Sequence, residues 1–382
     1  MTATQDPDPG SPARKGVRIA VDAMGGDHGA PEVVPGAVKW AREHPADEVI
    51  LVGDEPLVRS LAPDAPPNVR FVHGPEIVGM EEHHAARALA RKKQSSIRVA
   101  TELVKRGEAD GVLTAGHTGA GMAAGVLILG TLPGIDRPAL AVQLPGGKPF
   151  LLLDIGANPD STGENLAQYA RMGAIFAEHV MGIPNPRVAL LSIGEEKGKG
   201  DARIAKATEL IDRTDLNFIG NVEGRDLTKF VADVIVCDAV LGNVVMKFFE
   251  GLSRYIFDLI SAEFRGSLRG RLSGLLFLPS RARLVKKFDA EIVGGSPLLG
   301  VNGTMLITHG SARRRMIWYG MEATARTIRE GVNTLIAQSL GAAAQAGSEQ
   351  ATGTRPADAG VGSADAADDG EGPVHARGAE ED

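Results

Sequence analysis

The chain has a single cysteine, Cys237, few aromatic residues and no long apolar run. One cysteine excludes an intrachain disulfide framework and is typical of a reducing compartment. A membrane-spanning helix needs about 20 apolar residues in a row, and no window of the sequence approaches that length. The polar N-terminus lacks the apolar core of a signal peptide. We therefore expect a cytoplasmic protein. The aromatic content of 4% favours an α/β protein over a β-sandwich.

The body of the chain also lacks an excess of either charge. The net charge of −7 is carried entirely by residues 341–382, where acids outnumber bases. A neutral body argues against a general nucleic-acid-binding protein. Residues 1–16 and the acidic tail at 341–382 lack apolar periodicity, so both are predicted to be disordered. The interval 17–340 is predicted to form one α/β domain.

Between the tails, short β-branched runs alternate with stretches of helical periodicity. Strands are predicted at 17–21, 49–52, 69–72, 111–113, 139–142, 150–154, 187–192, 217–221 and 234–238, and helices at 34–43, 96–106, 118–129, 165–180, 202–213, 244–264 and 311–340. This alternation predicts βαβ units and a mostly parallel sheet. Ligands in such folds bind beyond the carboxyl ends of the strands.

The most informative segment, residues 19–35, has the sequence IAVDAMGGDHGAPEVVP. An apolar run stops at Asp22, a loop with Gly25, Gly26 and Asp27 follows, and a proline marks the start of a helix. This arrangement exposes backbone N–H groups at a helix N-terminus, where glycine lets the chain approach an anion closely. The segment therefore predicts a phosphate-handling α/β enzyme.

Five further polar loops follow predicted strands, and we expect all of them on one side of the sheet. They have the sequences TAGHTGAGM, DIGANPDSTGEN, SIGEEKGKGD, GNVEGRD and CDAVLGNVVMK. The candidate substrate- or phosphate-binding residues in these loops are Gly116, His117, Thr118, Gly119, Asn158, Glu195, Asn221, Glu223 and Asp238. For each loop alone, a plain turn is an alternative, and Thr118 is an alternative helix cap.

Three residues are candidate catalytic groups. Asn243 and Lys247 lie four positions apart at the start of a predicted helix, so they share a face. There, a lysine can neutralise a bound phosphate and an asparagine can donate to an oxyanion. Lys197 lies on a glycine-flanked loop that suits a phosphate clamp, although a solvated charged turn explains it equally well. We find no metal-ligand spacing, P-loop or G-x-S-x-G motif, so no metal is expected.

The segment 244–288 is distinct, because its first half has apolar residues at helical spacing and its second half is basic without any acid. Its candidate residues for contact with a partner protein or a membrane are Arg265, Arg269, Arg271, Leu275, Leu276 and Phe277. A basic amphipathic segment with an apolar tip indicates a membrane surface or an acidic partner protein. A dimer-forming helical hairpin is an equally supported and compatible alternative.

Taken in order, the motifs resemble the PlsX family of phosphate acyltransferases from about residue 17 to about residue 310. The motifs are IAVDAMGGDH, ALARKKQSS, TAGHTGA, GIDRPAL, LLDIGAN, RVALLSIGEEKGKG, NFIGNVEGRDL, ADVIVCDAVLGNVVMK and GGSPLLGVNG. The resemblance implies a three-layer α/β/α fold like that of phosphotransacetylases and isocitrate- or isopropylmalate-type dehydrogenases, with a protruding helical hairpin. It also implies a homodimer, peripheral membrane association and no cofactor.

The implied reaction transfers a long-chain fatty acyl group from acyl carrier protein to inorganic phosphate. The acyl phosphate product would then serve a membrane glycerol-3-phosphate acyltransferase in phospholipid synthesis. Two alternatives stay open. His117 stands where the family usually has Asn, and segments 80–86 and 311–315 also depart from the family pattern, which suits a non-catalytic paralogue that binds the carrier or a membrane. The second alternative is a short-chain phosphotransacetylase that uses coenzyme A thioesters.

Overall fold

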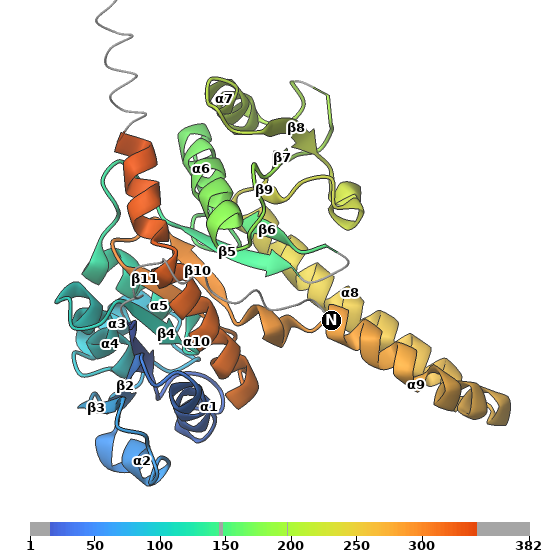
Figure 1. The fold of residues 1–382 in the computed structure, drawn as a ribbon. Coiled ribbons are helices and arrows are strands. Elements are labelled where there is room, and N and C mark those ends of the chain that lie inside the picture. The colour runs from blue at the N-terminus through green and yellow to red at the C-terminus, as the bar shows by residue number, and fades with distance from the viewer. Residues whose placement is uncertain (1–15, 145–147, 197, 342–382) are drawn as a thin grey trace, which may run out of the picture. The chain divides into compact units, whose positions relative to one another are not determined.

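The structure is a computed structural model that describes residues 16–144, 148–196 and 198–341. Lys197 and nearly all of the two predicted tails therefore lie outside the described residues. Within the described ranges, a single sheet of 11 strands has the order β3-β2-β1-β4-β11-β10-β5-β6-β9-β7-β8 (Figure 1). The strands are β1 (Arg18–Asp22), β2 (Glu48–Gly53), β3 (Val69–His73), β4 (Gly111–Thr114), β5 (Ala139–Leu144), β6 (Phe150–Leu153), β7 (Val188–Leu191), β8 (Phe218–Val222), β9 (Val234–Val236), β10 (Ser296–Leu299) and β11 (Thr304–Ile307).

The sheet has two parallel halves that run in opposite senses. Strands β3, β2, β1, β4 and β11 are parallel neighbours, and so are β6, β9, β7 and β8. Between the halves, β10 pairs antiparallel with β11 and with β5, and β5 pairs antiparallel with β6. The strand direction is therefore reversed from one half to the other. The expectation that all the polar loops lie on one side of the sheet is wrong, because the carboxyl ends of the two halves do not share an edge.

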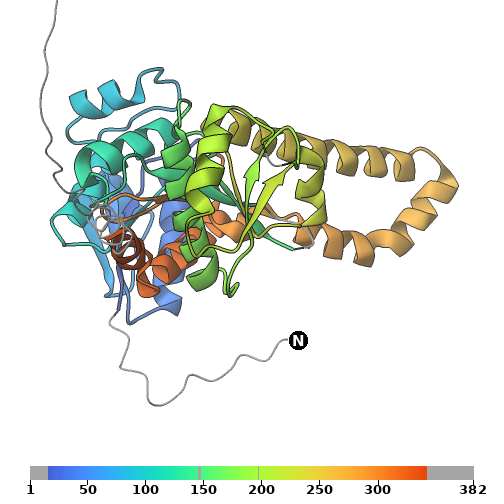
Figure 2. The same cartoon turned by 90° about the horizontal axis from the view of Figure 1, so that it is seen from above.

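Helices cover both faces of the sheet (Figures 1 and 2). The helices of the described residues are α1 (Ala30–Glu43), α2 (Glu55–Ser60), α3 (Ala85–Arg91), α4 (Ser96–Lys105), α5 (Thr118–Ala124), α6 (Gly163–His179), α7 (Ala202–Ile211), α8 (Ala239–Arg265), α9 (Leu268–Lys287) and α10 (Arg314–Arg329), with shorter helical turns η1 (Gly125–Leu129), η2 (Gly224–Lys229) and η3 (Ala290–Val293). Residues 332–341 are also helical. In the first half, α1 and α10 pack on one face and α4 and α5 on the other, whereas α6 packs on the second half.

Away from the edge strands β3 and β8, most strands are buried runs rich in Val, Ile and Leu, as expected where helices cover a sheet on both sides. The predicted α/β/α architecture with a mostly parallel sheet is thus confirmed. Capping residues set where several helices begin. Thr162 and Asn165 form a capping box at α6, and Asp201 and Asp238 accept backbone N–H groups at the starts of α7 and α8. No described helix is both long enough and apolar enough to cross a bilayer.

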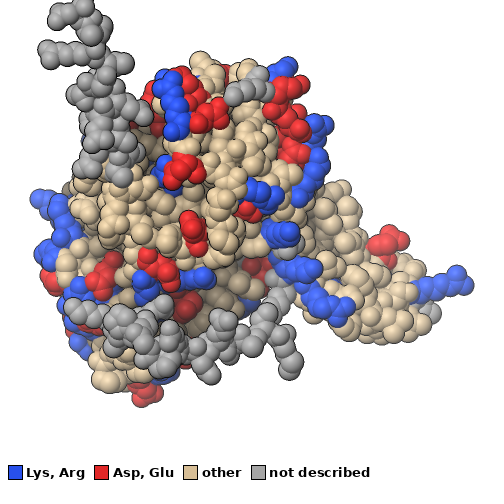
Figure 3. All heavy atoms as spheres, turned by 45° about the horizontal axis from the view of Figure 1, so that its top comes forward, with Lys and Arg blue, Asp and Glu red and all other residues tan. Residues whose placement is uncertain are grey.

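Helices α8 and α9 form a hairpin that extends away from the sheet (Figures 1 and 2). Aromatic contacts join the two helices, with ring centroids 5.2 Å apart for Phe264 and Phe277 and 5.9 Å apart for Phe257 and Phe288. After α9, Arg315 of α10 holds the following turn through ion pairs to the carboxylates of neighbouring acids, at 2.6 and 2.7 Å. Most of the visible hairpin surface is uncharged (Figure 3).

Candidate active site

Three loops that follow neighbouring parallel strands meet at one edge of the first half of the sheet. We call residues 23–29, 115–119 and 308–311, which follow β1, β4 and β11, the glycine cluster. The Asp27 N–H donates to the Gly310 carbonyl at 2.8 Å. A Cβ atom on Gly25 would lie 2.7 Å from the Gly116 nitrogen, and one on Gly26, where φ is +93°, would lie 2.9 Å from the Gly310 oxygen. Only glycine allows these backbones to lie so close together.

The buried carboxylate of Asp22 connects the loop after β1 with the loop after β4. Asp22 is buried and accepts the hydroxyls of Ser96 at 2.5 Å and Thr114 at 2.7 Å. Thr114 in turn accepts the Gly116 N–H at 3.0 Å. Burial raises the pKa of Asp22 above its ordinary value, and these hydrogen bonds oppose that shift. Asp22 thus sets the spacing between the β1 and β4 loops.

The start of α5 lies in the same cluster, and its cap is His117. The Nδ1 atom of His117 accepts the Gly119 N–H at 3.0 Å, so the neutral ring carries its proton on Nε2. The alternative in which Thr118 caps this helix is wrong, because Thr118 is the first helical residue and is exposed. The His117 ring therefore offers one N–H donor at the edge of the glycine cluster.

Two spaces adjoin the glycine cluster. The first is enclosed by Asp22, Gly25, Thr114, Gly116 and His117 among others, and its volume of about 10 Å³ suits one water rather than a phosphate. The second is an open cleft of about 580 Å³ along residues 24–31, 57 and 77–81. Among the described residues, the backbone N–H groups of His28, Gly29 and Ala30, which line this cleft, have no hydrogen-bond acceptor. They are the free donors at the start of α1.

Other predicted site residues lie in the second half of the sheet, and we call them the polar cluster. Its members are Asn158, Glu195, Asn221, Glu223 and Asp238. Asn158 is buried, and its side-chain amide donates to the Pro138 carbonyl at 2.7 Å and to Asp154 at 3.0 Å. Asn221 donates to the Lys199 carbonyl at 3.1 Å. Asp238 caps α8 and lies 3.4 Å from the guanidinium of Arg203.

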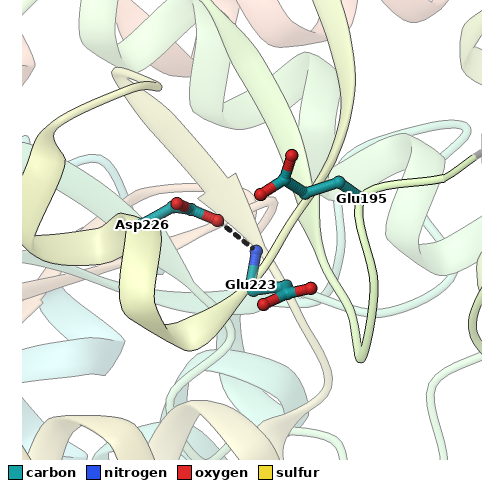
Figure 4. Close-up of side chains that lie close together, drawn as sticks. All are labelled: Glu195, Glu223 and Asp226. Atoms are coloured by element: carbon teal, nitrogen blue, oxygen red, sulfur yellow. Dashed lines mark hydrogen bonds between the residues drawn. The ribbon is translucent and has the colours of Figure 1, made fainter.

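Two of these residues belong to an acidic group. Ligand atoms of Glu195, Glu223 and Asp226 all lie within 4.8 Å of one another (Figure 4). Two cations offset most of this charge, because Arg225 pairs with Glu195 at 3.3 Å and with Glu223 at 2.9 Å, and Lys229 pairs with Asp226 at 2.8 Å. Asp226 also accepts the Glu223 N–H, which is a capping contact at the start of η2. Each acid of this group therefore has a cationic partner.

Two of the three candidate catalytic residues lie away from the glycine cluster. Asn243 and Lys247 lie on α8, which begins in the second half of the sheet, and Lys247 is exposed. Neither side chain has a hydrogen bond or an ion pair with the described residues. Lys197 lies outside the described residues.

The predicted contact residues all lie on the hairpin. Arg265, Arg269 and Arg271 are exposed, and Leu275 and Leu276 are 62% and 81% exposed. Phe277 is half-buried against Phe264, so it contributes to the hairpin's internal packing.

The loop after β11 was missed by sequence reasoning, although it completes the glycine cluster. In this loop, His309 Nδ1 lies 2.7 Å from the Ser311 hydroxyl and accepts the Ser311 N–H at 3.1 Å. The available signal was the apolar run at 304–307 followed by THGS, which is a strand followed by a glycine-containing turn. From the sequence, no strand is predicted over this run.

Comparison with known structures places this architecture among the phosphotransacetylase folds. A phosphotransacetylase from Streptococcus pyogenes superposes with a TM-score of 0.57 at 19% identity, covering 82% of this chain and 94% of that one. In sequence, residues 17–335 match a family profile described as "Fatty acid synthesis protein". A phosphate acyltransferase from Desulfitobacterium hafniense is 46% identical over 321 residues, which is 82% of this chain and 95% of the relative. One from Myxococcus xanthus is 42% identical over 354 residues, or 90% and 99% of the two chains. The chain therefore belongs to the phosphate acyltransferase family, as the motifs predicted.

Proposed function

We propose that this protein transfers a long-chain fatty acyl group from acyl carrier protein to inorganic phosphate, which yields an acyl phosphate for phospholipid synthesis. The relatives of the same family are named phosphate acyltransferases. The main structural support is the set of unpaired N–H groups of His28, Gly29 and Ala30, which line an open cleft at the start of α1. Such donors at the positive end of a helix dipole suit a phosphate.

The chemistry needs little beyond the positioning of two bound reactants. A phosphate oxygen attacks the thioester carbonyl carbon, a C–O bond forms, the C–S bond breaks, and the carrier's thiol leaves as a thiolate. Because a thiol has a pKa of about 8.5, the leaving group needs little help from an acid. The His117 Nε2–H and the backbone donors of the glycine cluster are the proposed contacts of the oxyanion that forms in the transition state. No enzyme nucleophile or cofactor takes part.

A direct assay tests the proposal. The purified chain is supplied with a long-chain acyl-carrier thioester and inorganic phosphate, and acyl phosphate is measured. Product from this donor supports the proposal. Product from acetyl-coenzyme A alone supports the short-chain phosphotransacetylase, and binding of the carrier without product supports the non-catalytic paralogue.

Lys247, Asn243 and Lys197 are proposed as further contacts of phosphate or of the oxyanion. The Lys247→Ala variant is expected to raise the KM for phosphate by about tenfold, since a charged hydrogen bond contributes about 1.5 kcal/mol or more. Steady-state kinetics against phosphate measures this. Lys39→Ala, which removes an exposed lysine of α1, is the matched control. An unchanged KM for Lys247→Ala would show that Lys247 does not contact the phosphate.

The hairpin is the proposed docking element, and its chemistry has two parts. Arg265, Arg269 and Arg271 offer exposed positive charge to the acidic carrier protein. The exposed Leu275 and Leu276 suit the surface of a membrane, where the acyltransferase that uses the product would lie. The apolar side chains exposed along α8 suit a homodimer. Together these features support peripheral association with a membrane.

Reversal of one hairpin charge tests carrier docking. The Arg271→Glu variant is expected to raise the KM for the acyl carrier several-fold and to weaken its dependence on salt, because charge steering is screened by ions. The KM is measured over a range of salt concentrations. Arg213→Glu, at an exposed arginine beyond the end of α7, should behave as the unmodified protein. A KM for the carrier that does not respond to salt in any variant contradicts this docking mode.

A further inference from the structure

We propose that the open cleft beside the glycine cluster binds the hydrocarbon chain of the acyl donor. The inference rests on the proposed acyl transfer and specifies where the chain of the substrate lies. The cleft has a volume of about 580 Å³, within the range of about 300–1,000 Å³ that is usual for small-molecule sites. One part of its lining is the glycine loop and the start of α1. Another part consists of Leu57, Ile77, Val78 and Met80.

The apolar part of the lining is exposed without a protein partner. Leu57, Ile77 and Met80 are 41%, 42% and 42% exposed, and they come from α2 and from the segment between β3 and α3. Single exposed apolar side chains are ordinary, but several around one cleft mark a binding surface. The segment that carries Ile77 is fixed, because the Lys92 ammonium binds the Ile77 carbonyl and the Glu82 carboxylate, both at 2.8 Å. The apolar surface is therefore formed before any ligand arrives.

The cleft is continuous with the proposed reaction centre. Ile77 and Val78 line both the cleft and the small enclosed space that Asp22, Gly116 and His117 border. A hydrocarbon chain in the cleft would thus place its carbonyl carbon beside the glycine cluster. There it would meet a phosphate held by the free N–H groups of residues 28–30.

Charge favours a hydrocarbon over the anionic parts of the donor. Within the part of the chain that the structure describes, the residues that line the cleft include no lysine or arginine, and the polar side chains among them are Asp27, His28 and Glu81. The nucleotide of coenzyme A, or the phosphate of a carrier's prosthetic arm, would find no cation along Leu57, Ile77 and Met80, and it would lie near the Glu81 carboxylate. A neutral alkyl chain has neither disadvantage, and its burial against this surface is favourable.

A series of straight-chain alkylphosphonates of increasing length tests the cleft directly, without turnover. Calorimetry below their micelle concentrations gives a Kd for each length. For the unmodified protein, each added methylene is expected to tighten binding by about fourfold until the cleft is full. Ile77→Asp is expected to lose most of this gain per added methylene. Ile219→Asp is the matched control, since Ile219 is also 42% exposed but lies on β8, at the far end of the strand order.

An unaltered gain per methylene in both Ile77→Asp and Leu57→Asp, with folding verified by circular dichroism, would overturn the inference. The acyl phosphate assay on the unmodified protein, run in parallel, distinguishes failure of the proposed function from failure of the proposed binding site for the chain. If no thioester yields acyl phosphate, the proposed function fails and the cleft loses its substrate. If acyl phosphate forms but neither variant changes the chain-length dependence, only the placement of the chain fails. The proposal is supported if the gain in affinity per methylene is lost in the two cleft variants and kept in Ile219→Asp.

Discussion

The Gly25→Ala variant is expected to lose about hundredfold in the rate of acyl phosphate formation while it stays folded. The added Cβ would lie 2.6 Å from a carboxylate oxygen of Asp22 and 2.7 Å from the Gly116 nitrogen. The Gly116 backbone cannot relieve this contact by a side-chain rotation, so the β1 and β4 loops must separate. A shift of this kind moves the start of α1 and the His117 ring relative to each other, and it should cost about 1–3 kcal/mol of stability.

Turnover and urea unfolding are measured on the same preparation, so that a catalytic loss can be separated from a folding defect. Gly224→Ala is the control, because a Cβ there would meet no atom within 4 Å. It should retain full activity. If Gly25→Ala remained as active as this control, the close approach of the two loops would have no role in catalysis, and the glycine cluster would not be the reaction centre.

Local sequence pattern predicted most of the fold, because buried parallel strands have a strong signature. It failed at β10 and β11, which lie in a segment rich in glycine. Strand β10 pairs antiparallel with β11 and with β5, and β5 pairs antiparallel with β6, so these three pairings together reverse the strand direction between the two halves. That reversal is a property of long-range pairing, and the alternation of short strands and helices contains no information about it. The prediction of one shared edge failed for this reason.

The candidate site shows the same division between local and long-range information. The loops after β1 and β4 were predicted because glycines directly follow a strand and precede a helix. The contact of Gly26 with Gly310 joins residues that are distant in the sequence, so it needed the structure. Asn158 and Asp238 also follow strands, yet their side chains bind backbone groups of the protein itself. A polar residue after a strand is equally suited to a cap and to a ligand, and only the fold distinguishes these uses.

Removal of the Asp22 carboxylate is the other change with a large expected effect. In Asp22→Ala, the hydroxyls of Ser96 and Thr114 and the Met24 N–H lose their common acceptor inside the protein. Each buried group left unpaired costs about 1–3 kcal/mol, so we expect a loss of about 3 kcal/mol in the free energy of unfolding. The β1 and β4 loops also lose their connection, so acyl phosphate formation should fall with stability. Urea unfolding and the acyl phosphate assay measure the two effects.

The Asp22→Asn variant keeps the shape of the side chain and removes its titration, while one acceptor oxygen becomes an amide donor. Burial raises the folded-state pKa of Asp22 above the ordinary value of 3.8, so the folded protein disfavours the ionised form. This contribution destabilises the native state as pH rises from 3.8 through the raised pKa, and Asp22→Asn lacks it. The stability of the unmodified protein relative to Asp22→Asn should therefore be greatest at low pH and should decline as pH rises through that window.

Asp160→Asn, at an exposed carboxylate paired with Arg137, should show a difference of at most about 1 kcal/mol. A stability difference for Asp22→Asn that grew with pH would mean that the hydrogen bonds to Asp22 outweigh its burial, and that the carboxylate is held between the two loops as a favoured anion.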